Sequence, residues 1–117
     1  MPWDALVAEL SAALDERITL DALTGTWRIV QRAAGHRHSV DDVLTAHHAL
    51  CELGASRAPS VLDLGSGIGG VGLLVLWGLG ATARLVCVEA QAQSHRLLVA
   101  NVAGNRLADR VVARLNN

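Results

Sequence analysis

The most constraining feature of this sequence is a short apolar run that leads directly into closely spaced glycines. Residues 60–64 read Ser-Val-Leu-Asp-Leu, and residues 65–70 read Gly-Ser-Gly-Ile-Gly-Gly. The first segment is typical of a buried strand, and an apolar helix pattern follows the second. A glycine loop at such a junction lets the backbone approach a ligand and presents free amides at the helix start. The pattern therefore predicts a strand, a nucleotide-type loop and a helix.

Helix and strand patterns continue to alternate after this loop. We expect a helix over residues 69–77, a buried strand over 84–88, a helix over 91–102 and a third strand over 110–115. Strands that alternate with helices form a parallel sheet through right-handed crossovers. The predicted fold class is therefore α/β, with a β-α-β-α-β unit in the C-terminal half.

The N-terminal half has a different pattern. An apolar stripe predicts a helix that ends near Asp15, residues 26–31 predict a short edge or hairpin strand, and Ser39 is placed to cap a helix over 40–53. At 117 residues the chain is short enough to be one folded unit. We divide it into a lead-in segment, residues 1–58, and a Rossmann-like segment, residues 59–117.

Two acidic residues narrow the choice of ligand. The spacing of Gly65, Gly67 and Gly70 also satisfies a dinucleotide fingerprint, and Glu89 stands where an acid binds ribose hydroxyls. Asp63 would repel the pyrophosphate of a dinucleotide, whereas S-adenosylmethionine brings a cationic amine and a sulfonium. A carboxylate at this place favours the methyl donor. A nicotinamide-dependent oxidoreductase and a purely structural turn remain the alternatives.

Residues 61–69 and 86–89 resemble the two cofactor motifs of the class I methyltransferases. The resemblance implies a Rossmann-like fold and S-adenosylmethionine, or S-adenosylhomocysteine, as cofactor. It further implies that Asp63 and the loop amides hold the methionine part, that Glu89 holds the ribose diol and that Ala90 lies beside the adenine. The implied loop residues are Gly65, Ser66, Gly67 and Gly69.

Residues 21–44 are similar to the lead-in of one subgroup, the bacterial tRNA adenine-N6 methyltransferases that act beside the anticodon of a valine tRNA, and their small-domain relatives. This resemblance implies that Arg37 and Asp41 lie at or near the cofactor. The chain departs from the pattern at His36, His38 and Asp42. In the alternative interpretation, Asp41 only caps a helix and Arg37 is solvated.

The resemblance also shows what this sequence lacks. The adenine-N6 branch grips its target amine with an Asn/Asp-Pro-Pro-aromatic motif, but the prolines here are Pro2 and Pro59. We therefore assign no catalytic residue and leave open a non-catalytic, cofactor-binding assembly module. In the implied strand order, residues 60–64 would be central with one side unpaired. We expect a fragment of a longer enzyme, or a chain that self-associates or pairs with a partner over that edge.

Composition excludes several other functions. The net charge of −1 provides no general basic field for nucleic acid, so a tRNA substrate would need a local patch. Cys51 and Cys87 are expected to be reduced core thiols, and without a secretory signal or membrane-length apolar run we predict a cytoplasmic protein. His47 and His48 diverge by about 100° around a helix, so no metal site is predicted.

Overall fold

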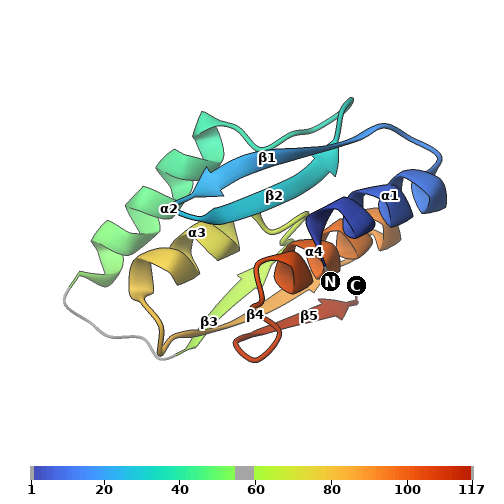
Figure 1. Cartoon of the computed structure of the whole chain (residues 1–117). Helices are drawn as coiled ribbons and strands as arrows, with labels where there is room; N and C mark the ends of the chain where they lie inside the picture. The colour runs from blue at the N-terminus through green and yellow to red at the C-terminus, as the bar shows by residue number, and fades with distance from the viewer. Residues whose placement is uncertain (1, 55–59, 117) are drawn as a thin grey trace.

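The computed structural model describes residues 2–54 and 60–116, which form one α/β unit (Figure 1). The structure confirms the predicted fold class and the β-α-β-α-β order of the second half. In chain order the elements are α1 (Trp3–Leu14), β1 (Ile18–Thr24), β2 (Trp27–Arg32), α2 (Val40–Leu53), β3 (Ser60–Leu64), α3 (Gly70–Leu79), β4 (Arg84–Glu89), α4 (Ala92–Gly104) and β5 (Val111–Leu115).

The main sheet is parallel and has the order β3-β4-β5. Its inner face is covered by α3 and α4, and the apolar core forms there around Leu73, Leu76, Leu85, Cys87 and Leu98. Burial of these side chains removes apolar surface from water, which is the main force that fixes helices on a sheet. The fold therefore places the C-terminal end of β3 directly against the start of α3.

The opposite face of this sheet has no covering layer in the described part of the chain. Leu62, Val86 and Val112 stand side by side across the three strands, and Leu62 and Val112 are 61% and 49% exposed. Leu64 is 72% exposed on the same face. Parallel sheets are normally covered on both faces, so this apolar surface is unusual for a finished fold.

An antiparallel hairpin of β1 and β2 forms a separate two-stranded sheet above α4 (Figure 1). The sequence predicts a strand at 26–31 but does not identify its partner, residues 18–24. Residues 18–22 do alternate strictly between apolar and polar, which is a strand signal that the prediction missed; the alternation ends at Ala22 and Leu23, where the pairing with β2 also shifts. Gly25, with a φ of +54°, makes the left-handed turn between the two strands.

Two asparagines on α4 fasten the hairpin to the rest of the fold. The fully buried Asn101 side chain accepts the Val30 N–H at 2.6 Å and donates to the carbonyls of Val30 and Ile68. One turn later, Asn105 makes the same pair of bonds to the backbone of Arg28. The two asparagines hydrogen-bond to backbone N–H and C=O groups on the outer edge of β2, as a neighbouring strand would. Asn101 also bonds to the glycine loop.

The structure corrects two expectations about burial. The strand at 60–64 was expected to be buried, but Ser60, Leu62 and Leu64 are exposed because β3 is an edge strand and these side chains stand on the sheet face that no described helix covers. Cys51 is exposed on α2, while Cys87 is a core residue as expected. The boundary drawn between residues 58 and 59 lies outside the described residues. None of the described helices has the length and hydrophobicity needed to cross a membrane.

Candidate functional site

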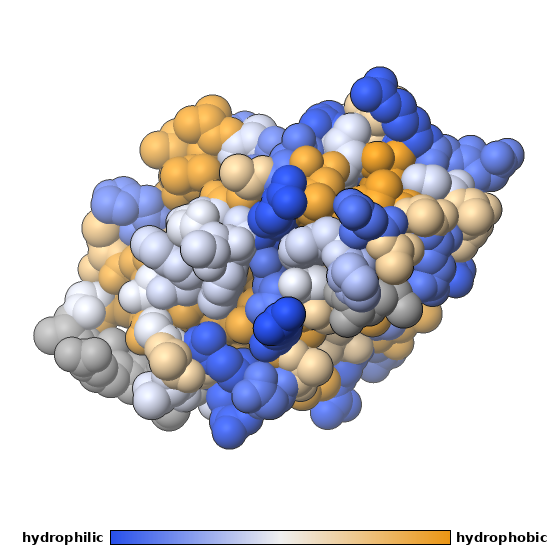
Figure 2. All heavy atoms as spheres, viewed as in Figure 1, coloured by the Kyte–Doolittle hydropathy of each residue, from blue (hydrophilic) through white to orange (hydrophobic). Residues whose placement is uncertain are grey.

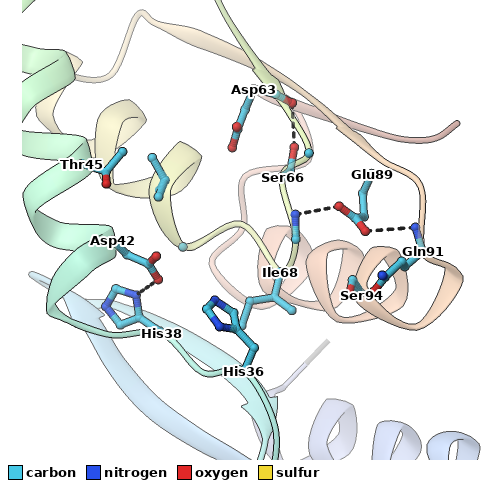
Figure 3. Close-up of a pocket in the computed structure, with 14 residues that line it drawn as sticks. His36, His38, Asp42, Thr45, Asp63, Ser66, Ile68, Glu89, Gln91 and Ser94 are labelled. Carbon is cyan, nitrogen blue, oxygen red and sulfur yellow. Dashed lines mark hydrogen bonds and ion pairs between the residues drawn. The ribbon is translucent and has the colours of Figure 1, made fainter. Parts of the chain in front are cut away.

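A cavity of about 560 Å³ opens where the C-terminal ends of β3 and β4 meet the start of α3 (Figure 3). The segment before α2 and the first turns of α2 form its other wall. In parallel α/β sheets, ligands bind at this carboxyl end of the strands. The lining residues are His36, His38, Asp42, Thr45, Asp63, Gly65, Ser66, Gly67, Ile68, Gly70, Val71, Glu89, Gln91 and Ser94.

The glycine loop has a backbone conformation that requires glycine. Gly65, Gly67 and Gly69 have φ values of +72°, +57° and +98°, which side chains rarely permit. The N–H groups of Gly65 and Ser66 both donate to the carbonyl of Val88, at 2.9 and 3.1 Å. The loop is therefore tied to the end of β4 before any ligand binds.

Glu89 ends β4 and anchors the loop through both of its carboxylate oxygens. Oε1 accepts the N–H of Gly67 at 2.9 Å, and Oε2 accepts the N–H of Gln91 at 3.0 Å (Figure 3). The residue is only 7% exposed. A buried carboxylate that is satisfied in this way holds two backbone segments together. Each oxygen retains a further lone pair on the cavity side for a hydroxyl donor.

Asp63, the last residue but one of β3, lies in a different environment. Its Oδ2 atom is buried, and no donor in the described residues meets it with the geometry of a hydrogen bond; the nearby Gly72 amide acts on its charge without completing such a bond. Burial raises the pKa of this carboxyl, the Gly72 amide in the first turn of α3 lowers it, and the charge of Glu89 raises it further. A Cβ atom on Gly72 would lie 2.7 Å from Oδ2, so α3 has room for the carboxylate only because residue 72 is glycine.

Asp42 contributes a third carboxylate, from the first turn of α2. Its Oδ2 accepts a hydrogen bond from Nδ1 of His38 at 2.8 Å, and both side chains are largely buried (Figure 3). The backbone N–H of His38 in turn donates to Oε1 of Gln31 on β2. A Cβ on Gly70 would lie 2.8 Å from Asp42 Oδ2. The hairpin thus positions His38, and the His38–Asp42 pair packs against the bare start of α3.

The structure brings five of the nine predicted cofactor residues together around the cavity: Asp63, Gly65, Ser66, Gly67 and Glu89. Four others lie outside its lining. Gly69 is turned inward, where a Cβ would meet Leu98 at 2.8 Å, and Ala90 is exposed just beyond Glu89.

Arg37 and Asp41 also lie outside the lining. The Arg37 guanidinium donates to the carbonyl of Arg32 at 2.8 Å and contacts Asp21 at 3.4 Å, so it braces the hairpin. Asp41 is exposed, and its carbonyl accepts the hydroxyl of Thr45. The neighbouring residues of both, His36, His38 and Asp42, face the cavity instead. The sequence pattern that could have identified His38 and Asp42 as neighbours is their four-residue spacing across a helix start.

The cavity lining is rich in acidic side chains. Asp42, Asp63 and Glu89 bring three carboxylates to the cavity, and its described lining contains no lysine or arginine. Within residues 2–54 and 60–116, no three side chains of histidine, cysteine, aspartate or glutamate are grouped to hold a metal ion. The cavity is therefore suited to a ligand that has a positive charge.

Comparison with solved structures identifies the fold. The chain is similar to TYW2 from P. horikoshii, crystallised with MeSAdo, at 18% identity and a TM-score of 0.63; the match covers 94% of this chain and 46% of that one. It is also similar to an O-methyltransferase from Bacillus cereus in complex with SAH, at 19% identity and a TM-score of 0.56, over 100% and 46%. The fold is that of Rossmann-like methyltransferases.

A third similar structure is coclaurine N-methyltransferase bound to N-methylheliamine and SAH, at 15% identity and a TM-score of 0.57, over 97% of this chain and 36% of that one. The chain thus spans less than half the length of these methyltransferases. No protein-family model matches the sequence. No curated protein matches it significantly.

Proposed function

We propose that this chain is the S-adenosylmethionine-binding part of a methyltransferase. The observation that best supports the proposal is Asp63, whose buried Oδ2 has no hydrogen-bond partner in the described residues. Buried polar atoms are nearly always satisfied, and an unsatisfied one beside a cavity is suited to a ligand donor. A cationic amine supplies both the missing hydrogen bond and a compensating charge.

The other lining residues fit the remaining parts of this cofactor. The Gly65 and Gly67 backbone carries no side chains and leaves room for its methionine part, although the two amides already donate to Val88 and Glu89. Glu89 has lone pairs for the two ribose hydroxyls, and Ala90, outside the lining, would lie beside the adenine. S-Adenosylmethionine supplies a methyl group on a sulfonium, which a nucleophile takes by direct displacement. The residues of this chain would bind and orient the methyl donor, so they would contribute to the reaction rate by holding the donor close to the acceptor.

The charge of the cavity argues against a dinucleotide. A pyrophosphate would be placed near Asp63, Asp42 and Glu89 without a lysine or arginine from the described lining to compensate. Like charges brought together in a partly buried site are strongly unfavourable. The glycine spacing alone does not make this distinction, because both ligand classes use a loop of this kind.

Calorimetric titration with S-adenosylhomocysteine tests the proposal directly. Replacement of Asp63 by Ala removes a charge-assisted hydrogen bond, and we expect affinity to fall about tenfold or more. Asp4→Ala, on the exposed face of α1, is the matched control and should bind as wild type does. Binding of NADH by a chain that ignores S-adenosylhomocysteine would instead support the oxidoreductase alternative.

We further propose an adenine N6 of tRNA, or of another nucleic acid, as the methyl acceptor. The support is the similarity of residues 21–44 to the tRNA adenine-N6 enzymes. Tritium transfer from labelled donor to tRNA by the purified chain tests this choice. A chain that binds S-adenosylhomocysteine but transfers no label to tRNA would favour the alternative role of a cofactor-binding assembly module.

We also propose that a second polypeptide layer completes the sheet in the active protein. β3 has one edge unpaired among the described strands, and its outer face exposes Leu62 and Leu64. The structures of similar fold are more than twice as long. Since α3 and α4 occupy one face, a right-handed crossover that returns from β5 to the open edge of β3 must place its helix on the bare face.

A strand beside β3 with an apolar helix across the bare face would cover both surfaces at once. Exposed apolar residues also gather over the first half of α2, at Val40, Val43 and Leu44, and appear as an orange patch in Figure 2. Left uncovered, such surfaces associate. We expect the isolated chain to elute from a sizing column above 12.3 kDa. A well-behaved monomer would contradict this proposal.

Two further proposals concern the lead-in segment and the location of the protein. We propose that the lead-in segment, residues 1–58, covers the cofactor, since His36, His38 and Asp42 form one wall of the cavity. We also propose a cytoplasmic location, because Cys51 and Cys87 are free thiols and free thiols are typical of reducing compartments.

A further inference from the structure

Asp42 is the one carboxylate of the cavity that the proposed binding scheme leaves without a role. Asp63 is assigned to the amine and Glu89 to the ribose, whereas Asp42 enters from the opposite wall on α2. Figure 3 shows it facing the start of α3, across the cavity from Glu89. Its side chain is 21% exposed, so solvent only partly screens its charge.

Several contacts hold this carboxylate in place. His38 Nδ1 donates to it at 2.8 Å, and His38 is itself positioned by Gln31 through its backbone N–H. The first turn of α3 packs against Asp42 at Gly70. A helix N-terminus favours negative charge. The surroundings therefore hold an anion at a fixed point that faces the ligand space.

We propose that Asp42, positioned by His38, selects the sulfonium form of the ligand over the uncharged thioether product. This inference rests on the proposed cofactor. S-Adenosylmethionine and S-adenosylhomocysteine share the amine, the carboxylate, the ribose and the adenine, and they differ at sulfur by one methyl group and one positive charge. A carboxylate on the α2 wall, apart from the amine and ribose contacts, stabilises the charged form and weakens retention of the product.

The experiment compares the dissociation constants of the two ligands by calorimetry for wild type, Asp42→Asn and Asp41→Asn. Asparagine preserves the shape of the side chain and removes its charge. For Asp42→Asn we expect the preference for S-adenosylmethionine over S-adenosylhomocysteine to fall about fivefold relative to wild type, as befits one partly screened charge. Asp41→Asn, one residue away on the exposed face, should leave the preference unchanged.

His38→Ala tests the positioning role separately. It removes the donor to Asp42 and should reduce the preference in the same direction, by less than Asp42→Asn does. A general loss of structure would weaken both ligands equally and leave their ratio unchanged, so the ratio separates positioning from folding. His38→Gln, which retains a donor, should restore part of the preference.

The outcomes separate the inference from the proposed function. If wild type binds neither ligand, the proposed cofactor is wrong and the inference falls with it. If both ligands bind and Asp42→Asn leaves their ratio as in wild type, the inference alone is overturned. An equal change of the ratio in Asp41→Asn would also overturn it, because the effect would then reflect the general charge of α2.

Discussion

Asp63 and Glu89 stand at the carboxyl ends of neighbouring strands, yet they meet opposite environments. Both oxygens of Glu89 accept backbone N–H groups, from Gly67 and from Gln91. Oδ2 of Asp63 is buried with no such partner in the described part of the chain. The two acids lie on adjacent strands in a paired sheet, so the difference arises from the loops and helices around them and not from the strands.

Glu89 and Asp63 thus show two different roles of a buried carboxylate, one in stability and one in ligand binding. Glu89 contributes to stability as well as to the site, because its removal would leave two amides unsatisfied and release the glycine loop. Asp63 costs stability, since burial of a carboxylate without full hydrogen bonding is unfavourable. Binding sites often retain such unfavourable groups because they act on the ligand. Stability and binding should therefore respond differently when each acid is changed.

The largest expected effect is that of Glu89→Ala. The change removes two charge-assisted, partly buried hydrogen bonds to backbone amides, which we expect to lower the free energy of unfolding by about 2–4 kcal/mol. Urea denaturation measures this loss. Binding of S-adenosylhomocysteine should disappear as well, because the loop and the ribose contact are lost together. An unfolding free energy equal to that of wild type would show that the loop does not depend on Glu89.

Glu89→Gln is the matched control for this prediction. The amide keeps one acceptor oxygen of nearly the same shape, so one of the two backbone bonds can persist. We expect a loss of stability between those of wild type and Glu89→Ala. A loss as large as that of Glu89→Ala would mean that the charge is what matters at this position.

A smaller effect is expected at the other acid, from Gly72→Ala. The new Cβ would lie 2.7 Å from Asp63 Oδ2 and must displace the carboxylate. We expect an overpacking cost of about 1–2 kcal/mol and a fall in S-adenosylhomocysteine affinity of severalfold. If Gly72→Ala weakens binding only by displacing the Asp63 carboxylate, the double variant with Asp63→Ala should bind no more weakly than Asp63→Ala alone. Additive losses in the double variant would contradict that route.

The sequence predicts the strand, the glycine loop and the two acids because these features depend on local patterns. The strand, the glycine spacing and the acids Asp63 and Glu89 occur in contiguous segments, and a parallel sheet necessarily brings adjacent strand ends together. The structure confirms the fold and places these two acids on the same cavity. Sequence patterns do not show which acid would be satisfied by amides, since that depends on the exact path of each loop.

Other parts of the site depend on contacts that sequence patterns do not encode. Arg37 and Asp41 were predicted at the site, whereas their neighbours His38 and Asp42 face the cavity. Along α2, a step of one residue turns the side chain by about 100°, which separates Asp41 from Asp42. Asn101 is likewise unremarkable in sequence, yet it bonds to Val30 of the hairpin, 71 residues away, and to Ile68 of the glycine loop, 33 residues away. Such long-range contacts become visible only once the elements are packed.

The smallest expected effect is the pH dependence of stability at Asp63. Burial raises the pKa of this carboxyl in the folded chain above the ordinary value of 3.8, so below neutral pH the native state takes up a proton before the unfolded state does. The stability cost of Asp63 is then present at neutral pH and is relieved as the pH falls through the raised pKa. The unfolding free energy of wild type, relative to Asp63→Asn, should rise between pH 7 and pH 4 by about 1 kcal/mol or less.

The stability contributed by Asp21 should change with pH in the opposite direction, because hydrogen bonds from Gln31 and Thr19 lower the pKa of its carboxyl. Relative to Asp21→Asn, wild type should lose stability as the pH falls through that lowered pKa. If both pairs showed the same sign, the unsatisfied state of Asp63 would not be what distinguishes it from Asp21, whose carboxylate is hydrogen-bonded by Thr19 and Gln31.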